Sequence, residues 1–213
     1  VGIIWYNAKK MVLVTIGRYF STQGGILICS TFISLEMSGA YGLTMQALQA
    51  VASVSNIYLQ TLIPSISAAS IRDDKAGCKE GFSAGICVFW TLYPVGVIFV
   101  GTLCNPLLGL LHANTMLLEA FPFFVLAFGY FFLSNYVNFN IVFESRNRIP
   151  HMKAEFGFGI FNLCSMIALC RFFHMGIWGI ILNQTLLPLL YNAWHWPGKA
   201  IQLLDADIKD MFF

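Results

Sequence analysis

The sequence has 213 residues, of which 58% are hydrophobic and only 10% are charged, against a charged fraction of roughly 25% in ordinary soluble domains. This composition argues against a soluble globular domain, and a formal net charge of +2 is too small to indicate a nucleic-acid-binding protein. The charged residues are also bunched, with none between Glu80 and Glu119. Because an unpaired charge in hydrocarbon costs on the order of 3 kcal/mol, the uncharged stretches predict membrane spans.

Six apolar stretches are long enough to be transmembrane helices, since a helix needs about 20 residues to cross a hydrocarbon layer of ~30 Å. Residues 1–11, before them, are interpreted as a cut end or a connecting segment of a longer protein. Residues 197–213, after them, alternate apolar and charged residues at helical spacing and predict an amphipathic cytoplasmic tail. The predicted fold class is therefore all-α, a polytopic membrane protein with a six-transmembrane-helix bundle at residues 12–35, 40–69, 82–110, 120–143, 156–175 and 176–196.

The basic residues give these spans a direction. Clusters of Lys and Arg lie before the first span and after the second, fourth and sixth, whereas the loops around Glu36 and from His112 to Glu119 have none. By the positive-inside rule the basic side is the cytoplasm, so both ends of the chain are predicted there. An even number of spans also lets a second unit follow in the same orientation, as in transporters built from parallel repeats. Arg18, inside the first span, and Arg171, near the outer end of the fifth, are the exceptions.

A stripe of small and polar residues runs along the second predicted span. Its members recur at alternating spacings of 3 and 4 residues, which places them on one helix face. Such a face turns away from lipid, and two interpretations stay open: it packs against a neighbouring helix, or it forms a cavity wall that offers hydrogen bonds to a hydroxyl-rich solute. The stripe consists of Gly39, Gly42, Gln46, Gln49, Ser53, Asn56 and Gln60.

Arg18 is the basic residue placed deepest in a predicted span. Its side chain could snorkel to the cytoplasmic surface. It could instead face a central cavity and bind a phosphate with two hydrogen bonds, which would suit a substrate that carries a pyrophosphate. Both interpretations stay open for Arg18, whereas snorkelling is preferred for Arg171, which lies closer to a span end.

Amides and tyrosines mark the end of the fourth predicted span. Asn135 and Asn138 share a helix face, and Tyr130 and Tyr136 lie close by in the sequence. Aromatic rings beside amides suit sugar binding. The preferred interpretation of the tyrosines is nevertheless the interfacial belt that Tyr and Trp form at membrane surfaces.

No pattern for catalysis or metal binding is apparent. The six cysteines and four histidines have no metal-ligand spacing, and the paired Asp73 and Asp74 are interpreted as part of a solvated loop rather than a Mg²⁺ site. No Ser/His/Asp arrangement and no glycine-rich phosphate loop is found in the sequence. The chain is therefore predicted not to be an enzyme and to need neither a metal nor another cofactor.

Three stretches carry a resemblance to a known family. They are the passage from Glu36 to Gln46, the basic loop from Arg72 to Gly77, and the closing segment from Asn192 to Pro197. With the polar second span and the asparagine-rich fourth, they resemble the second half of Wzx-type polysaccharide or O-antigen flippases. These flippases belong to the multidrug/oligosaccharidyl-lipid/polysaccharide superfamily, together with the MATE exporters.

The resemblance implies the C-terminal lobe of a transporter with two six-helix lobes. Such a protein moves lipid-linked oligosaccharide, a polyprenyl-diphosphate sugar, across the bacterial inner membrane by alternating access, for lipopolysaccharide and other surface polysaccharides. Expected partners are membrane lipids, the lipid-linked oligosaccharide, the missing N-terminal lobe, a polysaccharide polymerase and glycosyltransferases. The candidate cavity residues are Arg18, Gln46, Gln49, Ser53, Asn56, Gln60, Asn135 and Asn138.

Two alternatives remain. A MATE-type exporter of small organic molecules should have an acidic residue deep in a span, and none is seen in the middle of the predicted spans. A membrane scaffold subunit should have the stripe from Gln46 to Gln60 sealed against a neighbouring helix, whereas a transporter should have it lining an open groove.

Overall fold

The computed structural model describes the backbone of residues 2–146 and 149–204, and the side chains of these residues from Lys9 onward. Within these ranges the chain is helical almost throughout and contains no β-strand. Helices suit a hydrocarbon environment because they satisfy their own backbone hydrogen bonds. The helices are α1 (Gly2–Phe32), α2 (Leu35–Ser55), α3 (Ile57–Ile71), α4 (Lys75–Leu110), α5 (Ala120–Glu144), α6 (Met152–Arg171), α7 (Ile177–Leu190) and α8 (Asn192–Leu203).

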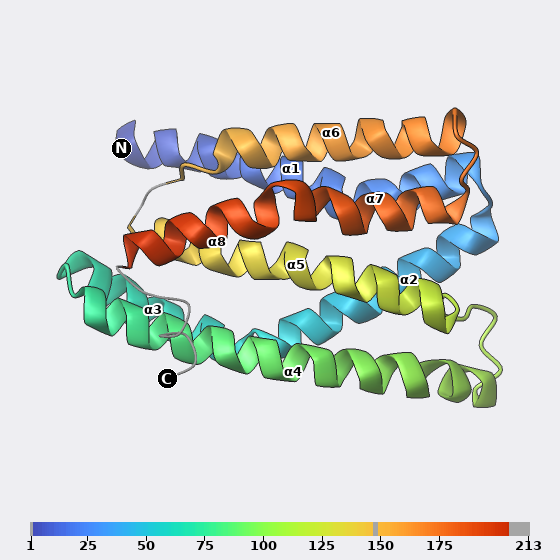
Figure 1. Ribbon diagram of the computed structural model, residues 1–213, viewed down its shortest axis with the longest axis horizontal. Coiled ribbons are helices and arrows are strands. Elements are labelled where there is room, and N and C mark those ends of the chain that lie inside the picture. The colour runs from blue at the N-terminus through green and yellow to red at the C-terminus, as the bar shows by residue number, and fades with distance from the viewer. Residues whose placement is uncertain (1, 147–148, 205–213) are drawn as a thin grey trace.

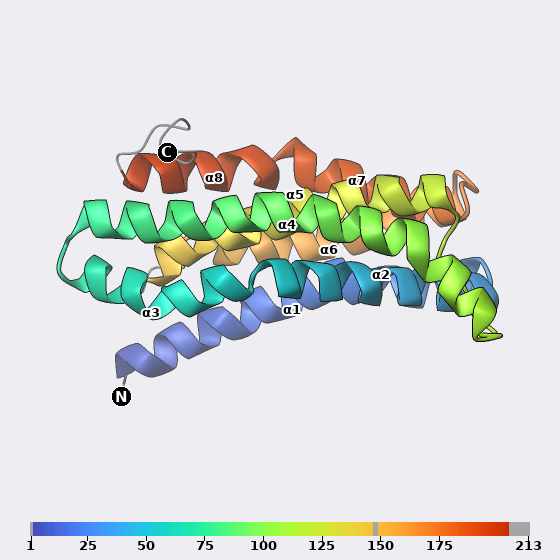
Figure 2. The ribbon, with the colours of Figure 1, turned by 90° about the horizontal axis from the view of Figure 1, so that it is seen from below.

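The helices lie along the long axis of the molecule, and their connections gather at its two ends (Figure 1, Figure 2). One end holds the start of α1, the α3–α4 turn, the α5–α6 connection and the end of α8. The opposite end holds the α1–α2, α4–α5 and α6–α7 connections. Since α2 and α3 follow each other in one direction, as do α7 and α8, the eight helices make six lengthwise segments. Among the described residues, the Lys and Arg clusters that are predicted to be cytoplasmic lie near the first of these two ends.

Two of the predicted spans are divided. α2 and α3 meet at Asn56, which keeps a helical backbone conformation, and α7 and α8 meet at Tyr191, which leaves it. Before the first break, the hydroxyls of Ser53 and Ser55 donate to the carbonyls one turn earlier, a contact that bends helices. Pro188 weakens the backbone hydrogen bonding just before the second break.

The surface and the helix lengths are those of a membrane protein. In the described ranges, four helical stretches are long and apolar enough to cross a membrane: Lys9–Phe32 of α1, and the whole of α4, α5 and α6. Large apolar side chains such as Val95, Phe99 and Phe121 are exposed on the outside of the bundle, an arrangement that lipid stabilises and water does not. The prediction of six membrane spans goes further than this finding, because two of them are divided into shorter helices.

The backbones of α1 and α6 approach each other closely. A methyl group at Gly17 would lie 2.5 Å from the carbonyl oxygen of Glu155, and one at Gly159 would overlap the backbone of Gly17. Small residues at a crossing point let two membrane helices touch along their backbones. This contact places Arg18, the next residue on α1, beside the first turn of α6.

α5 lies between α4 on one side and α7 and α8 on the other. On the α4 side, Tyr93 donates its hydroxyl to the carbonyl of Ala127 at 3.0 Å. On the α7 side, the hydroxyl of Thr185 donates to the carbonyl of Val125 at 3.1 Å. Backbone carbonyls of an apolar helix thus receive a second hydrogen bond from each neighbour, which fixes α5 in the centre of the bundle.

The ends of the described chain differ in part from the predicted segments. α1 begins at Gly2, so residues 2–11 continue the first helix. The predicted tail, residues 197–213, begins inside α8, which ends at Leu203, and its last nine residues, 205–213, lie outside the described residues. A short turn joins α6 to α7, and its residues His174 and Gly176 both have positive φ.

The α1–α6 contact gives a stability prediction. Replacing Gly17 with Ala should lower the free energy of unfolding by about 1–3 kcal/mol, because the methyl group would meet backbone that cannot move aside. Gly157 is the matched control, since it lies on the same pair of helices with open space around its Cα. We expect Gly157→Ala to be neutral or slightly stabilising in thermal unfolding in detergent. Equal melting temperatures for the two variants would contradict this packing.

Candidate functional site

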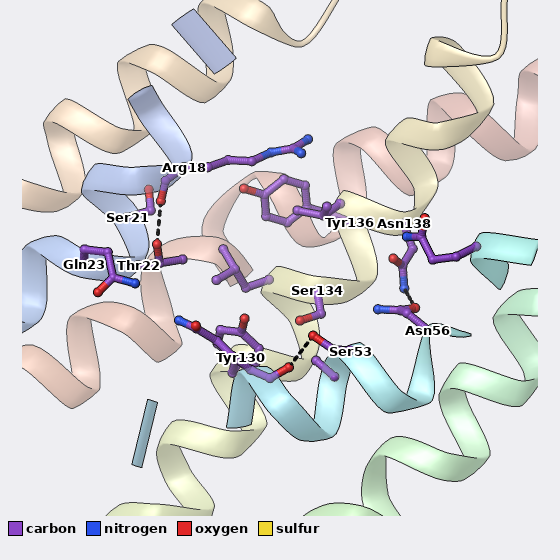
Figure 3. A pocket seen from close by; sticks show the side chains of 15 residues that line it. Arg18, Ser21, Thr22, Gln23, Ser53, Asn56, Tyr130, Ser134, Tyr136 and Asn138 are labelled. Carbon is purple, nitrogen blue, oxygen red and sulfur yellow. Dashed lines mark hydrogen bonds between the residues drawn. The ribbon is translucent and has the colours of Figure 1, made fainter. Parts of the chain in front are cut away.

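A polar cavity of about 550 Å³ lies among α1, α2, α3 and α5. Its volume is within the range of small-molecule sites, roughly 300–1,000 Å³. Figure 3 shows side chains from these helices converging on it. Its walls consist of Arg18, Ser21, Thr22, Gln23, Gln49, Ala52, Ser53, Asn56, Gln60, Tyr130, Leu133, Ser134, Tyr136, Val137 and Asn138.

The stripe on the second predicted span forms one wall of this cavity over most of its length. Gln49, Ser53, Asn56 and Gln60 all line it. Because Asn56 keeps a helical conformation, the stripe continues from α2 to α3 across the break. Gln46 is exposed and is not among the lining residues, so the structure does not place this candidate at the cavity.

The stripe also packs against another helix at one point. Asn138 on α5 donates its amide to the side-chain oxygen of Asn56 at 2.8 Å, at the cavity wall (Figure 3). The two interpretations of the stripe therefore apply to different residues. Asn56 joins two helices, whereas Gln49 and Gln60 lie on the wall on either side of it.

Asn135 does not face the cavity. Its side-chain oxygen accepts a hydrogen bond of 2.6 Å from the indole nitrogen of Trp90 on α4. Asn135 and Asn138 are three residues apart on α5, and their bonding partners nevertheless lie on different helices. Asn135 therefore fastens α5 to α4 and is not placed in the candidate site.

The two tyrosines of α5 both line the cavity. Tyr136 is only 1% exposed, and its hydroxyl donates to the carboxylate of Glu155 at 3.2 Å. A residue of an interfacial belt would face the membrane surface instead. The structure thus places Tyr136 inside the bundle and gives its polar end a specific partner.

Arg18 lies on the cavity wall with its side chain 30% exposed. Its Nη2 donates to Oε1 of Glu155 at 3.4 Å and lies 3.7 Å from Oε1 of Glu144. The guanidinium group therefore does not stand unpaired in the cavity. It forms ion pairs with two acidic side chains from α5 and α6.

Glu155 is the buried charge that the sequence interpretation missed. It is 1% exposed and accepts hydrogen bonds from Arg18, from Tyr136, and from the Asn140 amide at 3.2 Å. The predicted fifth span began at residue 156, so Glu155 was grouped with the charges of the preceding loop. The spacing of four residues between Glu155 and Gly159 was an available signal, because it puts the carboxylate on the helix face that touches α1.

Two further side chains complete what we call the Arg18 cluster: Arg18, Tyr136, Asn140, Glu144, His151 and Glu155. The ring of His151 is completely buried, with its Nε2 3.3 Å from Oε1 of Glu144. Three helices and the residue preceding α6 therefore contribute to one polar cluster beside the cavity. In the described ranges no group of three or more His, Cys, Asp or Glu residues is arranged to hold a metal ion.

A second polar cluster joins α1 to α6 and α7. Gln184 donates to the carbonyl of Ser21 at 2.6 Å, and Asn162 donates to the same carbonyl at 3.4 Å. Asn183 accepts a hydrogen bond of 2.8 Å from Ser165. These amides are buried and bonded to one another and to backbone, so they act as interhelical contacts of the kind common in membrane bundles.

The Tyr136 hydroxyl provides a test of the Arg18 cluster. Tyr136→Phe should lower the free energy of unfolding by about 1.5–3 kcal/mol, because Glu155 loses a donor in a buried place. Tyr19→Phe is the matched control, since Tyr19 lies on α1 with its ring exposed, and its effect should stay within about 0.5 kcal/mol. Chemical unfolding in detergent measures both. An unchanged stability for Tyr136→Phe would show that this hydrogen bond does not support the cluster.

Comparisons with known proteins do not assign the chain to a family. No family model matches the sequence, and neither curated proteins nor solved structures gave a match. A function must therefore be argued from the cavity itself, from its polar walls and from the charges beside it.

Proposed function

We propose that this chain is the C-terminal lobe of a flippase that moves lipid-linked oligosaccharide across the bacterial inner membrane for surface polysaccharide synthesis. In this proposal its six lengthwise segments are membrane spans, with both ends of the chain in the cytoplasm. The observation that carries the proposal is the polar cavity of about 550 Å³ inside a bundle with an apolar exterior. The sequence resemblance to Wzx-type flippases supports the same function.

The cavity walls suit a solute with many hydroxyl groups. The amides of Gln49, Gln60 and Asn138 carry both donors and acceptors, and the Ser53 hydroxyl, whose proton goes to a backbone carbonyl, offers an acceptor. Polar side chains at membrane depth are costly unless they face protein or water, and they commonly mark the path of a substrate. A sugar chain passing through would exchange its water contacts for contacts with these groups.

The divided helices suit a transporter that alternates between two openings. α2 and α3 meet at Asn56 on the cavity wall, and α7 and α8 meet at Tyr191. Transporters commonly bend at discontinuous helices and at segments weakened by proline when they pass from one state to the other. The missing N-terminal lobe would face the open side of the cavity in this proposal.

The scaffold alternative receives less support than transport. A scaffold would have the stripe sealed against a neighbouring helix, but Gln49, Ser53 and Gln60 line a cavity. The exporter alternative gains one observation, because Glu155 is an acidic residue buried within a helix long enough to span. Its carboxylate is paired with Arg18, however, and does not line the cavity, so it offers no unpaired charge to an organic cation.

The proposed function predicts a difference between neighbouring members of the stripe. In the full-length protein, the double variant Gln49→Ala/Gln60→Ala should reduce surface polysaccharide roughly thirtyfold, because two hydrogen-bonding groups of about 1 kcal/mol each are lost from the wall. Gln46→Ala is the matched control, since Gln46 belongs to the same stripe but lies off the cavity. Polysaccharide is measured on cells that depend on the variant, with protein levels determined by immunoblot.

Two results would count against the proposal. Surface polysaccharide equal to that of Gln46→Ala would remove the cavity from transport. A loss caused equally by Gln46→Ala would indicate that the stripe acts outside the cavity, as a scaffold contact would.

A further inference from the structure

Arg18 is the one charged residue among the described residues that line the cavity. All other polar groups on the walls are amides, hydroxyls and phenols. Arginine stays protonated in proteins, so its charge is permanent. The charge preference of the cavity therefore depends on whether this guanidinium is balanced.

Two carboxylates flank the same nitrogen of Arg18. Glu155 lies at 3.4 Å and Glu144 at 3.7 Å from Nη2. Glu155 also accepts hydrogen bonds from Tyr136 and Asn140. One ionised carboxylate balances the guanidinium, and two ionised carboxylates leave one negative charge in excess, so in neither case does Arg18 present an uncompensated positive charge.

The position of Arg18 is fixed by backbone contacts. Gly17 and Gly159 bring α1 and α6 together one residue before it, without room for a methyl group. The Arg18 backbone carbonyl also accepts the hydroxyl of Thr22 at 3.0 Å. The backbone of Arg18 is therefore held in a fixed position opposite its acidic partners.

We infer that the cavity has no uncompensated positive charge and that Arg18 is a positioning residue, which ties α1 to α5 and α6 and does not bind an anion. The head group that the cavity takes is then an uncharged, hydroxyl-rich glycan. The identification of the head group as a glycan rests on the proposed function. Its lack of charge rests on the Arg18 cluster. The inference replaces the expectation that Arg18 holds the pyrophosphate of the substrate.

The charge of the cavity can be measured with thiol reagents. Ser53 lies on the wall and is exposed to it, so Ser53→Cys introduces a thiol of nearly the same size. The purified chain is labelled with an anionic and a cationic methanethiosulfonate, and the rate ratio is compared with that of free cysteine in solution. The unsubstituted chain, with its six native cysteines, supplies the background rate for each reagent.

We expect the ratio for Ser53→Cys to show no preference for the anionic reagent relative to free cysteine. Adding Glu144→Gln and Glu155→Gln together should shift it at least about threefold toward the anionic reagent, because both partners of Arg18 are then uncharged, and adding Arg18→Gln alone should shift it as far toward the cationic one. Replacing Arg18, Glu144 and Glu155 together with Gln should remove the shift toward the anionic reagent. A preference for the anionic reagent before any change in the Arg18 cluster would overturn the inference, and that measurement requires no variant of the cluster to fold.

Ligand protection tests the nature of the head group. Maltotriose should slow labelling of the introduced thiol, and inorganic pyrophosphate at the same concentration should not. Slowing by pyrophosphate would overturn the inference, and slowing by neither compound would overturn the assignment of an uncharged glycan. The two proposals can fail separately. If the Gln49→Ala/Gln60→Ala variant makes normal polysaccharide while the labelling ratio shows no preference for the anionic reagent, the proposed function is refuted and the charge compensation of Arg18 still holds.

Discussion

Where α1 and α6 cross, the backbones of Gly17 and Gly159 touch, and the charged groups inside the bundle are arranged around this contact. Arg18 follows Gly17 directly, and Glu155 lies one turn before Gly159. In water such a pair would contribute little, because solvent screens it. Inside an apolar bundle, each member would be costly without the other. The close crossing therefore makes it possible to keep two opposite charges in the interior.

The remaining polar groups divide into two sets with different surroundings. Asn135, Asn162 and Gln184 are buried and bonded to a neighbouring helix, so they hold the bundle together. Gln49 and Gln60 lie on the cavity wall. The first set satisfies its hydrogen bonds within the protein, and the second leaves hydrogen-bonding capacity for a solute. The groups that hold the bundle together are therefore different from the groups that line the cavity.

The sequence predicted the helical character and the shared face of the polar stripe, because both depend on spacing along one helix. It could not predict which neighbour that face meets. The helical period places Asn135 and Asn138 on one face of α5. In the structure, however, the partner of Asn135 is on α4 and the partner of Asn138 lies between α2 and α3. Glu155 was missed for a related reason, because a charge near a span end looks like a loop charge until its partner on another helix is known.

The balanced pair has a consequence for the energy source of any rocking motion. A transmembrane potential does work of about 2.3 kcal/mol per elementary charge per 100 mV on charges that cross the field. Arg18 and Glu155 have opposite charges and lie 3.4 Å apart, so they carry no net charge when they move together. Voltage therefore does almost no net work on this pair. Under the proposed flippase function, the energy for its motion comes from differences in binding on its two sides, or from charges outside this pair.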